Sequence, residues 1–184
     1  MVTPAVRATI SALAILVLAI SGCATPQVPA ATASLRPTTG NNAGGTVRFT
    51  QTGDQVVVSG EVRGLKPGAT HGFHVHEKGD CSSGDGTSAG GHFNPESKPH
   101  GQHGQGMHHA GDLPSLKADA NGVAVFSFES RSIRVGSGAT DVVGRGLIVH
   151  RDPDDFTTQP TGNAGPRLAC AVIVKAQQTG TPGY

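Results

Sequence analysis

Glycine and proline occur so often in this chain that turns and loops are favoured over long helices. The 184 residues include 27 glycines and 12 prolines, and both residue types destabilise a helix interior. The intervening segments are short and rich in β-branched residues, and none after Cys23 shows the 3.6-residue apolar spacing of a helix. Many short strands separated by turns predict an all-β fold, a sandwich or a barrel.

Six segments are predicted to be strands, and two long loops interrupt their rhythm. The expected strands are residues 46–50, 55–62, 72–76, 122–128, 142–150 and 168–175. Two segments, 77–116 and 151–167, lack strand patterning, and structureless segments of this length in a compact domain usually carry function. Seven of the nine histidines lie in or beside the first of these segments.

The first residues predict export. Arg7 precedes an apolar run at 8–20, which is too short to span a membrane and is typical of a secretory signal. The run ends in small residues before Cys23, which resembles a bacterial lipobox; an ordinary signal peptide with an incidental cysteine is the alternative. By the same resemblance, Ala24 after the cysteine favours sorting to the outer membrane.

These features divide the chain into four parts. Residues 1–22 are the expected signal peptide, 23–44 a lipid anchor and flexible linker, 45–176 the folded domain and 177–184 a C-terminal tail. We expect the protein in the periplasm, attached to the outer membrane through Cys23. In that oxidising compartment the two remaining cysteines, Cys81 and Cys170, lie where a disulfide can persist.

The composition argues against nucleic acid as a partner. Charged residues make up 15% of the chain, the formal net charge is +1, and aromatic residues make up 4% with no tryptophan. The chain therefore offers neither a strong basic field nor a platform for stacking bases.

The histidines form a pattern that indicates a metal site. His74 and His76 lie two residues apart in an expected strand, so both imidazoles point to the same face. Alone, such a pair is weak evidence for a metal site, and two half-buried, hydrogen-bonded histidines are the alternative. It is followed by further candidate ligands at His92, His100, His109, Asp112 and His150. Imidazoles with one carboxylate suit zinc, and several imidazoles suit copper, so the chemistry indicates zinc, copper or both.

Five segments carry a specific resemblance. Residues 72–81, 88–95, 109–113, 144–150 and 162–170 resemble the motifs of copper/zinc superoxide dismutase, in that family's order and spacing. The bacterial periplasmic branch is the closer match, because the cysteine at position 81 directly follows Gly79 and Asp80. The resemblance covers residues 45–176. It implies an immunoglobulin-like Greek-key β-sandwich, or flattened barrel, with two long functional loops.

The resemblance also implies one copper and one zinc ion per subunit. Copper would be bound by His74, His76, His92 and His150. Zinc would be bound by His92, His100, His109 and Asp112. His92 would lie between the two metals as a bridging imidazolate.

Further roles follow from the same resemblance. Asp154 would hydrogen-bond the outer nitrogens of one copper and one zinc histidine. Arg167 would attract and bind the superoxide anion, and Thr161 would line its channel. Cys81 and Cys170 would form the disulfide. Superoxide would be converted to dioxygen and hydrogen peroxide by copper redox cycling, with Arg167 and His92 as the catalytic residues. This activity would protect the cell envelope.

Several points stay open at this stage. Residues 151–161 contain no lysine, so the lysine-bearing loop of the eukaryotic enzymes is not matched, and Lys78 or Lys98 are other sources of steering. A monomer and a homodimer are both compatible with the sequence. The main alternative function is a non-enzymatic copper/zinc-binding envelope lipoprotein. The histidines left without a role are His71, His103 and His108, with metal capture by His103, Met107 and His108 as one interpretation.

Overall fold

The computed structural model describes residues 28–177, and they form an all-β domain, as expected from the sequence. The elements are β1 (Ala30–Pro37), β2 (Gly44–Thr52), β3 (Gln55–Arg63), β4 (Thr70–His71), β5 (Phe73–His76), η1 (Thr87–Ala89), β6 (Leu116–Lys117), β7 (Ala124–Ser130), β8 (Gly146–His150), β9 (Arg167–Val172) and β10 (Val174–Lys175). The one helical element in this range is the short 3₁₀ turn η1. No helix within it has the length and apolar character needed to cross a membrane.

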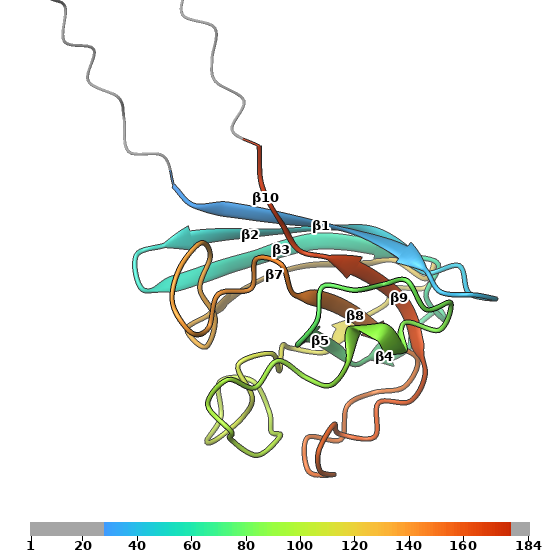
Figure 1. Ribbon diagram of the computed structural model, residues 1–184. Coiled ribbons are helices and arrows are strands. Elements are labelled where there is room, and N and C mark those ends of the chain that lie inside the picture. The colour runs from blue at the N-terminus through green and yellow to red at the C-terminus, as the bar shows by residue number, and fades with distance from the viewer. Residues whose placement is uncertain (1–27, 178–184) are drawn as a thin grey trace, which may run out of the picture.

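The strands form a curled antiparallel sheet. Its order is β5-β8-β9-β1-β2-β3-β7, with β10 paired to β1, while β4 and β6 form a separate pair. The curl occurs at β1, because its residues 30–35 pair with β2 whereas Arg36 and Pro37 pair with β9. Figure 1 shows β1 crossing over the molecule, with β2, β3 and β7 on one side and β5, β8 and β9 on the other. The two halves therefore face each other like the layers of a sandwich.

Alternating side chains build one core between these halves. Val47 and Phe49 on β2 are fully buried, and so are Phe73 on β5 and Leu147 on β8. Because successive side chains of a strand point to opposite faces, the residues between them are directed out of the core. On β5 and β8 these outward positions carry histidines. The hydrophobic pattern of two core strands thus also decides which face receives the candidate metal ligands.

The prediction that residues 23–44 form a flexible linker is wrong for residues 30–37. Residues 30–37 form the strand β1, and Ala31, Ala33 and Leu35 are buried in the core. Polar residues alternate with these three, which is the period of a strand, but alanine contributes too little apolar surface for the pattern to stand out. The folded domain therefore begins near residue 30 rather than 45. The expected signal peptide, Cys23 and most of the expected C-terminal tail lie outside the described residues.

Other strand limits also differ from those expected. The segment 142–150 becomes a strand only at Gly146, because residues 142–145 form a turn in which Arg145 donates to the carbonyl of Val142 at 3.0 Å. Gly144 has a φ of 80° in this turn, a conformation that glycine adopts without steric cost. The segment 168–175 is divided into β9 and β10. The short strands β4 and β6 are not apparent in the sequence pattern.

The role of β1 can be tested with a pair of substitutions. Ala33→Asp places an unpaired carboxylate in the core and is expected to lower the free energy of unfolding by more than about 3 kcal/mol. Ser34→Asp, at the neighbouring exposed position, is expected to change it by less than about 0.5 kcal/mol. Urea unfolding of both variants measures the difference. Equal stability of the two variants would show that residues 30–37 are not a core strand.

Candidate metal centre

Strands β5 and β8 position three of the histidines. His74 and His76 lie on β5, opposite Ile148 and Gly146 of β8, and His150 ends β8. A register shift between Val149 and His150 bends the strand at this end, where His150 is paired with Arg167 of β9. Gly146 has to be small, because a Cβ there would lie 3.3 Å from the Cβ of His76 and 2.6 Å from the carbonyl oxygen of Lys78.

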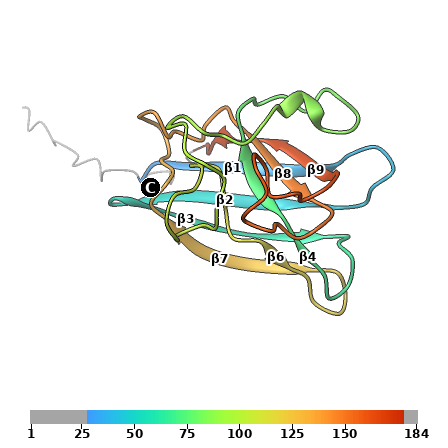
Figure 2. The same cartoon turned by 90° about the horizontal axis from the view of Figure 1, so that it is seen from below.

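The long loop between β5 and β6 supplies the other candidate ligands by running along the free edge of β5. His92 forms an isolated bridge with His76, and Asp112 forms one with His74. The main chain of Val75 secures both arms of the loop, since its N–H donates to Gly111 at 2.9 Å and its carbonyl accepts from Phe93 at 2.8 Å. The loop lacks strand patterning, yet this pairing fixes its position. Figure 2 shows it, in green to yellow-green, folded over one end of the sheet.

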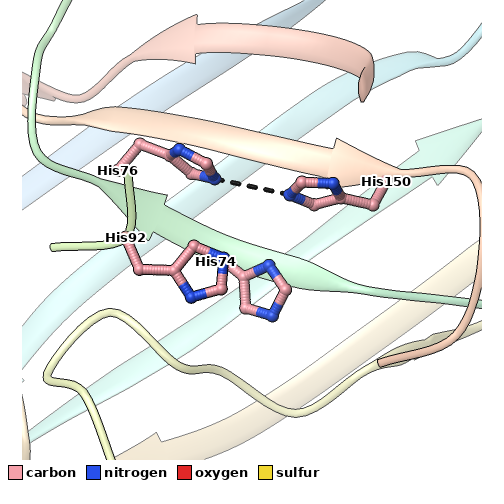
Figure 3. A group of neighbouring side chains, drawn as sticks. All are labelled: His74, His76, His92 and His150. Atoms are coloured by element: carbon pink, nitrogen blue, oxygen red, sulfur yellow. Dashed lines mark hydrogen bonds between the residues drawn. The ribbon is translucent and has the colours of Figure 1, made fainter. Parts of the chain in front are cut away.

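The loop and strands together form two adjoining groups of four possible ligands. One group contains His74, His76, His92 and His150; the other contains His92, His100, His109 and Asp112. All these residues are buried, and within each group the ligand atoms lie within 4.8 Å of one another. His92 belongs to both groups. Figure 3 shows the first group, with the rings of His76 and His150 facing each other above those of His92 and His74.

Unpaired nitrogen atoms in the first group fit a bound cation. The buried atoms His74 Nδ1 and His92 Nε2 have no hydrogen-bond partner. His76 and His150 each donate Nδ1–H to a main-chain carbonyl, of Gly90 at 2.9 Å and of Gly165 at 3.0 Å. Their Nε2 atoms therefore carry lone pairs, and these atoms face each other at 3.4 Å. Buried lone pairs that converge in this way are stabilised by a metal ion, and four imidazoles suit copper.

The second group has the donor set of a zinc site. Asp112 Oδ1 lies 2.9 Å from His92 Nδ1, 3.0 Å from His100 Nδ1 and 3.3 Å from His109 Nδ1. The other carboxylate oxygen, Oδ2, accepts from the main-chain N–H groups of His109 and Gly101, at 2.9 and 3.1 Å. These two bonds fix the carboxylate. Three imidazoles and one carboxylate around a point match tetrahedral zinc.

Asp154 connects the two groups. Its Oδ2 accepts from His74 Nε2 at 2.7 Å, and its Oδ1 accepts from His100 Nε2 at 2.8 Å. Both rings are thereby held with Nδ1 turned toward the ligand groups. The flanking carboxylates do not share this contact: Asp152 pairs with Arg151, and Asp155 bonds Thr157 and Thr158 within its own loop.

Burial keeps three histidines of the first group neutral, namely His76, His92 and His150. It lowers the pKa of His150 to about 3 and that of His92 to about 4, and it holds the pKa of His76 well below the ordinary value. The charge of Arg167 also lowers the pKa of His76 and His150. Because a metal binds only the deprotonated ring, these histidines are ready to bind a metal at neutral pH.

Carboxylates reverse this effect at His100, in the second group. Burial acts to lower the pKa of His100, but hydrogen bonds to Asp112 and Asp154 raise it to about 9. Burial likewise acts to raise the pKa of Asp112, yet its histidine partners bring it well below the ordinary value. The two carboxylates thus attract a positive charge to this position. A divalent ion supplies that charge in place of the proton on His100.

The disulfide and Arg167 join the long loop to β9. Cys81 and Cys170 form the expected disulfide, with their Cα atoms 5.9 Å apart. It closes a loop of 89 residues, worth about 4–5 kcal/mol in the loop-entropy account. Three residues before Cys170, Arg167 donates to the carbonyls of Gly86 at 2.5 Å and Gly90 at 2.6 Å. Since Gly90 also accepts from His76, one carbonyl holds both the guanidinium and a possible copper ligand.

Some supporting residues were not identified from the sequence. The carbonyls of Gly90 and Gly165 orient His76 and His150, but a main-chain acceptor has no signature in the sequence. Gly162 lies directly against Asp154 and His100, so a Cβ there would collide with both side chains. The glycines at both ends of residues 162–165 are the one feature of the sequence that could have indicated such a close contact. Thr161, expected to line the channel, is half-buried beside it.

A β-sandwich with two adjoining four-ligand groups that share one imidazole defines a dinuclear metalloprotein. A family model described as copper/zinc superoxide dismutase matches residues 43–173. The chain belongs to the copper/zinc superoxide dismutase family, and as such it is a copper- and zinc-dependent oxidoreductase.

Relatives support this assignment. The chain is 44% identical over 140 residues to a superoxide dismutase [Cu-Zn] of Paramecium bursaria Chlorella virus 1, covering 73% of this chain and 74% of the relative. It is 40% identical over 141 residues to an extracellular superoxide dismutase [Cu-Zn] of Brugia pahangi, covering 72% and 69%. A crystal structure of the clock protein EA4 is similar, with a TM-score of 0.74 and 38% identity, over 83% of this chain and 98% of that one.

Asp154 provides a direct test of the centre. Asp154→Asn removes the charge that orients His74 and His100 and is expected to weaken metal binding about 10- to 100-fold. Competition with a chromogenic chelator measures copper and zinc separately. Asp155→Asn, in the same loop but outside this contact, serves as the control. Unchanged affinities in Asp154→Asn would contradict the role given to this carboxylate.

Proposed function

We propose that this protein dismutates superoxide at the dinuclear centre described above. Copper is assigned to His74, His76, His92 and His150. Zinc is assigned to His92, His100, His109 and Asp112. The observation that carries the proposal is that His92 belongs to both groups, with Nδ1 beside Asp112 and a buried, unpartnered Nε2 on the side of His74 and His76.

The chemistry divides between the metals and the chain. When bound, copper supplies one-electron exchange with superoxide and zinc supplies a fixed charge that is not redox-active. His92 Nε2 is the position at which a proton is held and then given to the product, peroxide. Asp154 holds the rings of both halves in place throughout.

Arg167 is the proposed anion-guiding group. Its two bonds to Gly86 and Gly90 fix the guanidinium, and it lines a surface pocket of about 360 Å³ with Thr38, Asp85 and Pro166. Its charge is among the causes that lower the pKa of His76 and His150, so its field reaches the proposed copper ligands. Lys98 is already paired with Glu96 at 2.7 Å, which weakens its claim to a steering role. Thr161 is proposed as a channel-wall residue from the resemblance.

We place this activity in the bacterial cell envelope, on a lipid anchor at Cys23. The lipobox-like segment supports this location, as does the Cys81–Cys170 disulfide, which persists in oxidising compartments. One relative is named an extracellular superoxide dismutase. Since β1 begins at Ala30, residues 24–29 would be the tether, and a fully extended chain from Cys23 to Ala30 spans at most about 25 Å. The domain would therefore work close to the membrane surface, where it would protect the envelope from superoxide.

A dismutation assay on metal-quantified protein tests the activity and the role of Arg167 together. The loaded enzyme is expected to be active, and Arg167→Ala to be slower by roughly tenfold or more at low ionic strength, with a weaker salt dependence. Arg48→Ala removes one exposed charge elsewhere and is the control for net charge. No activity with both metals bound would favour the metal-binding lipoprotein instead. An unchanged rate in Arg167→Ala would contradict its role.

The anchor has its own experiment. In cells, the protein is expected in the membrane fraction, and Cys23→Ser is expected to release it in soluble form, because the thioether that carries the lipid is lost. Cys81→Ser, which leaves Cys23 intact, should remain with the membrane. Continued membrane association of Cys23→Ser would rule out lipidation at this residue.

A further inference from the structure

A second pair of histidines lies on the outside of the zinc-ligand loop. The rings of His103 and His108 are 5.5 Å apart between centroids and tilted by 53°. The pair His100 and His109, both proposed zinc ligands, is also 5.5 Å apart and tilted by 58°. His103 and His108 therefore have the spacing and tilt of two imidazoles that share one ion, yet they belong to neither ligand group.

His103 and His108 make the same kind of hydrogen bond as His76 and His150, from Nδ1 to a main-chain carbonyl. His103 Nδ1 bonds the carbonyl of Asp112 at 2.9 Å, and His108 Nδ1 bonds the carbonyl of His109 at 2.7 Å. Carbonyls only accept, so Nδ1 carries the proton in both rings. This leaves Nε2 with a lone pair, as in His76 and His150. A main-chain carbonyl that fixes the ring in this way is the usual support of a metal-binding histidine.

The surroundings of the two Nε2 atoms lack strong partners. His103 Nε2 lies 3.3 Å from the carbonyl oxygen of Glu129, which is itself an acceptor. His108 Nε2 accepts a long hydrogen bond from the N–H of Gly104 and lies beside the hydroxyl of Ser132, both at 3.3 Å, and a bound metal ion would replace these contacts. Within the zinc group, Asp112 Oδ1 lies 2.9 Å from His92 Nδ1, and the Nδ1 atoms of His92 and His109 are 3.4 Å apart. The nitrogen of His103 and the oxygen of Glu129 thus lie at a distance at which two atoms can bind the same cation.

The site is open and its donors are borderline soft. His103, His108, Glu129 and Ser132 line a surface pocket of about 530 Å³. Met107, directly before His108, is 68% exposed, so its thioether is also accessible. Imidazole nitrogens favour copper over magnesium or calcium, and copper(II) is the tightest binder among the common divalent ions.

We propose that His103 and His108 bind a third metal ion, copper, at an exposed site separate from the dinuclear centre. The two rings are held by the main-chain carbonyls of Asp112 and His109, two residues whose side chains are proposed zinc ligands. The site therefore lies on the outer side of the loop that carries the zinc ligands. Because it is open to solvent, this ion binds more weakly than the two buried ones and exchanges with free copper.

The experiment uses the protein loaded with copper and zinc. Copper(II) is added as a weak chelate, and bound metal is counted after gel filtration, with electron paramagnetic resonance used to detect imidazole nitrogens on the added ion. The wild type is expected to take up one further copper with two nitrogen ligands. His103→Gln is expected to weaken this uptake by more than about tenfold while keeping its original copper, zinc and dismutase activity.

Two further variants make the result decisive. Gln105→Ala changes an exposed residue of the same loop and should retain the third copper. His108→Gln should lose it, and its zinc content shows whether the neighbouring ligand His109 is intact. The proposal is overturned if the loaded wild type binds no third copper, or if His103→Gln binds it as tightly as the wild type. Neither result would affect the function proposed for the dinuclear centre.

Discussion

The buried carboxylate of Asp154 is the contact on which the metal centre depends. It accepts from His74 on β5, from His100 in the loop between β5 and β6, and from the main chain of Phe156 in its own loop. One side chain thus joins a strand and two loops that are far apart in the sequence. Gly162 leaves the space for it. Without this charge, the rings of His74 and His100 would lose the partner that fixes their orientation.

The centre combines three ligands from strands with four from a loop. His74, His76 and His150 lie on strands whose other faces are buried in the core, so their positions follow from the sheet. The remaining ligands come from a loop that is fixed by main-chain bonds to β5, by the disulfide and by the proposed zinc ion. We infer that copper geometry is set mainly by the sheet and that zinc and the disulfide order the loop around it.

The protein has few basic side chains, and the position of Arg167 is therefore important. Arg167 is bound to Gly86 and Gly90, and Gly90 also holds His76. A guanidinium fixed by main-chain carbonyls keeps its remaining N–H groups available to a small anion. The disulfide three residues later connects the same strand to the same loop. The proposed anion site and the proposed copper ligands are therefore positioned by one set of contacts.

The sequence by itself determined the all-β class, the two long loops and the candidate ligands, because strand periodicity and histidine spacing are local properties. It did not reveal β1, whose small alanines are buried only in the assembled core. Only the tertiary structure decided which nitrogen of each histidine is free. That choice depends on Asp154 and on the carbonyls of Gly90 and Gly165, residues 14 to 80 positions away from the rings they orient. Such partners are set by the three-dimensional packing of loops against strands, and spacing along the chain does not encode them.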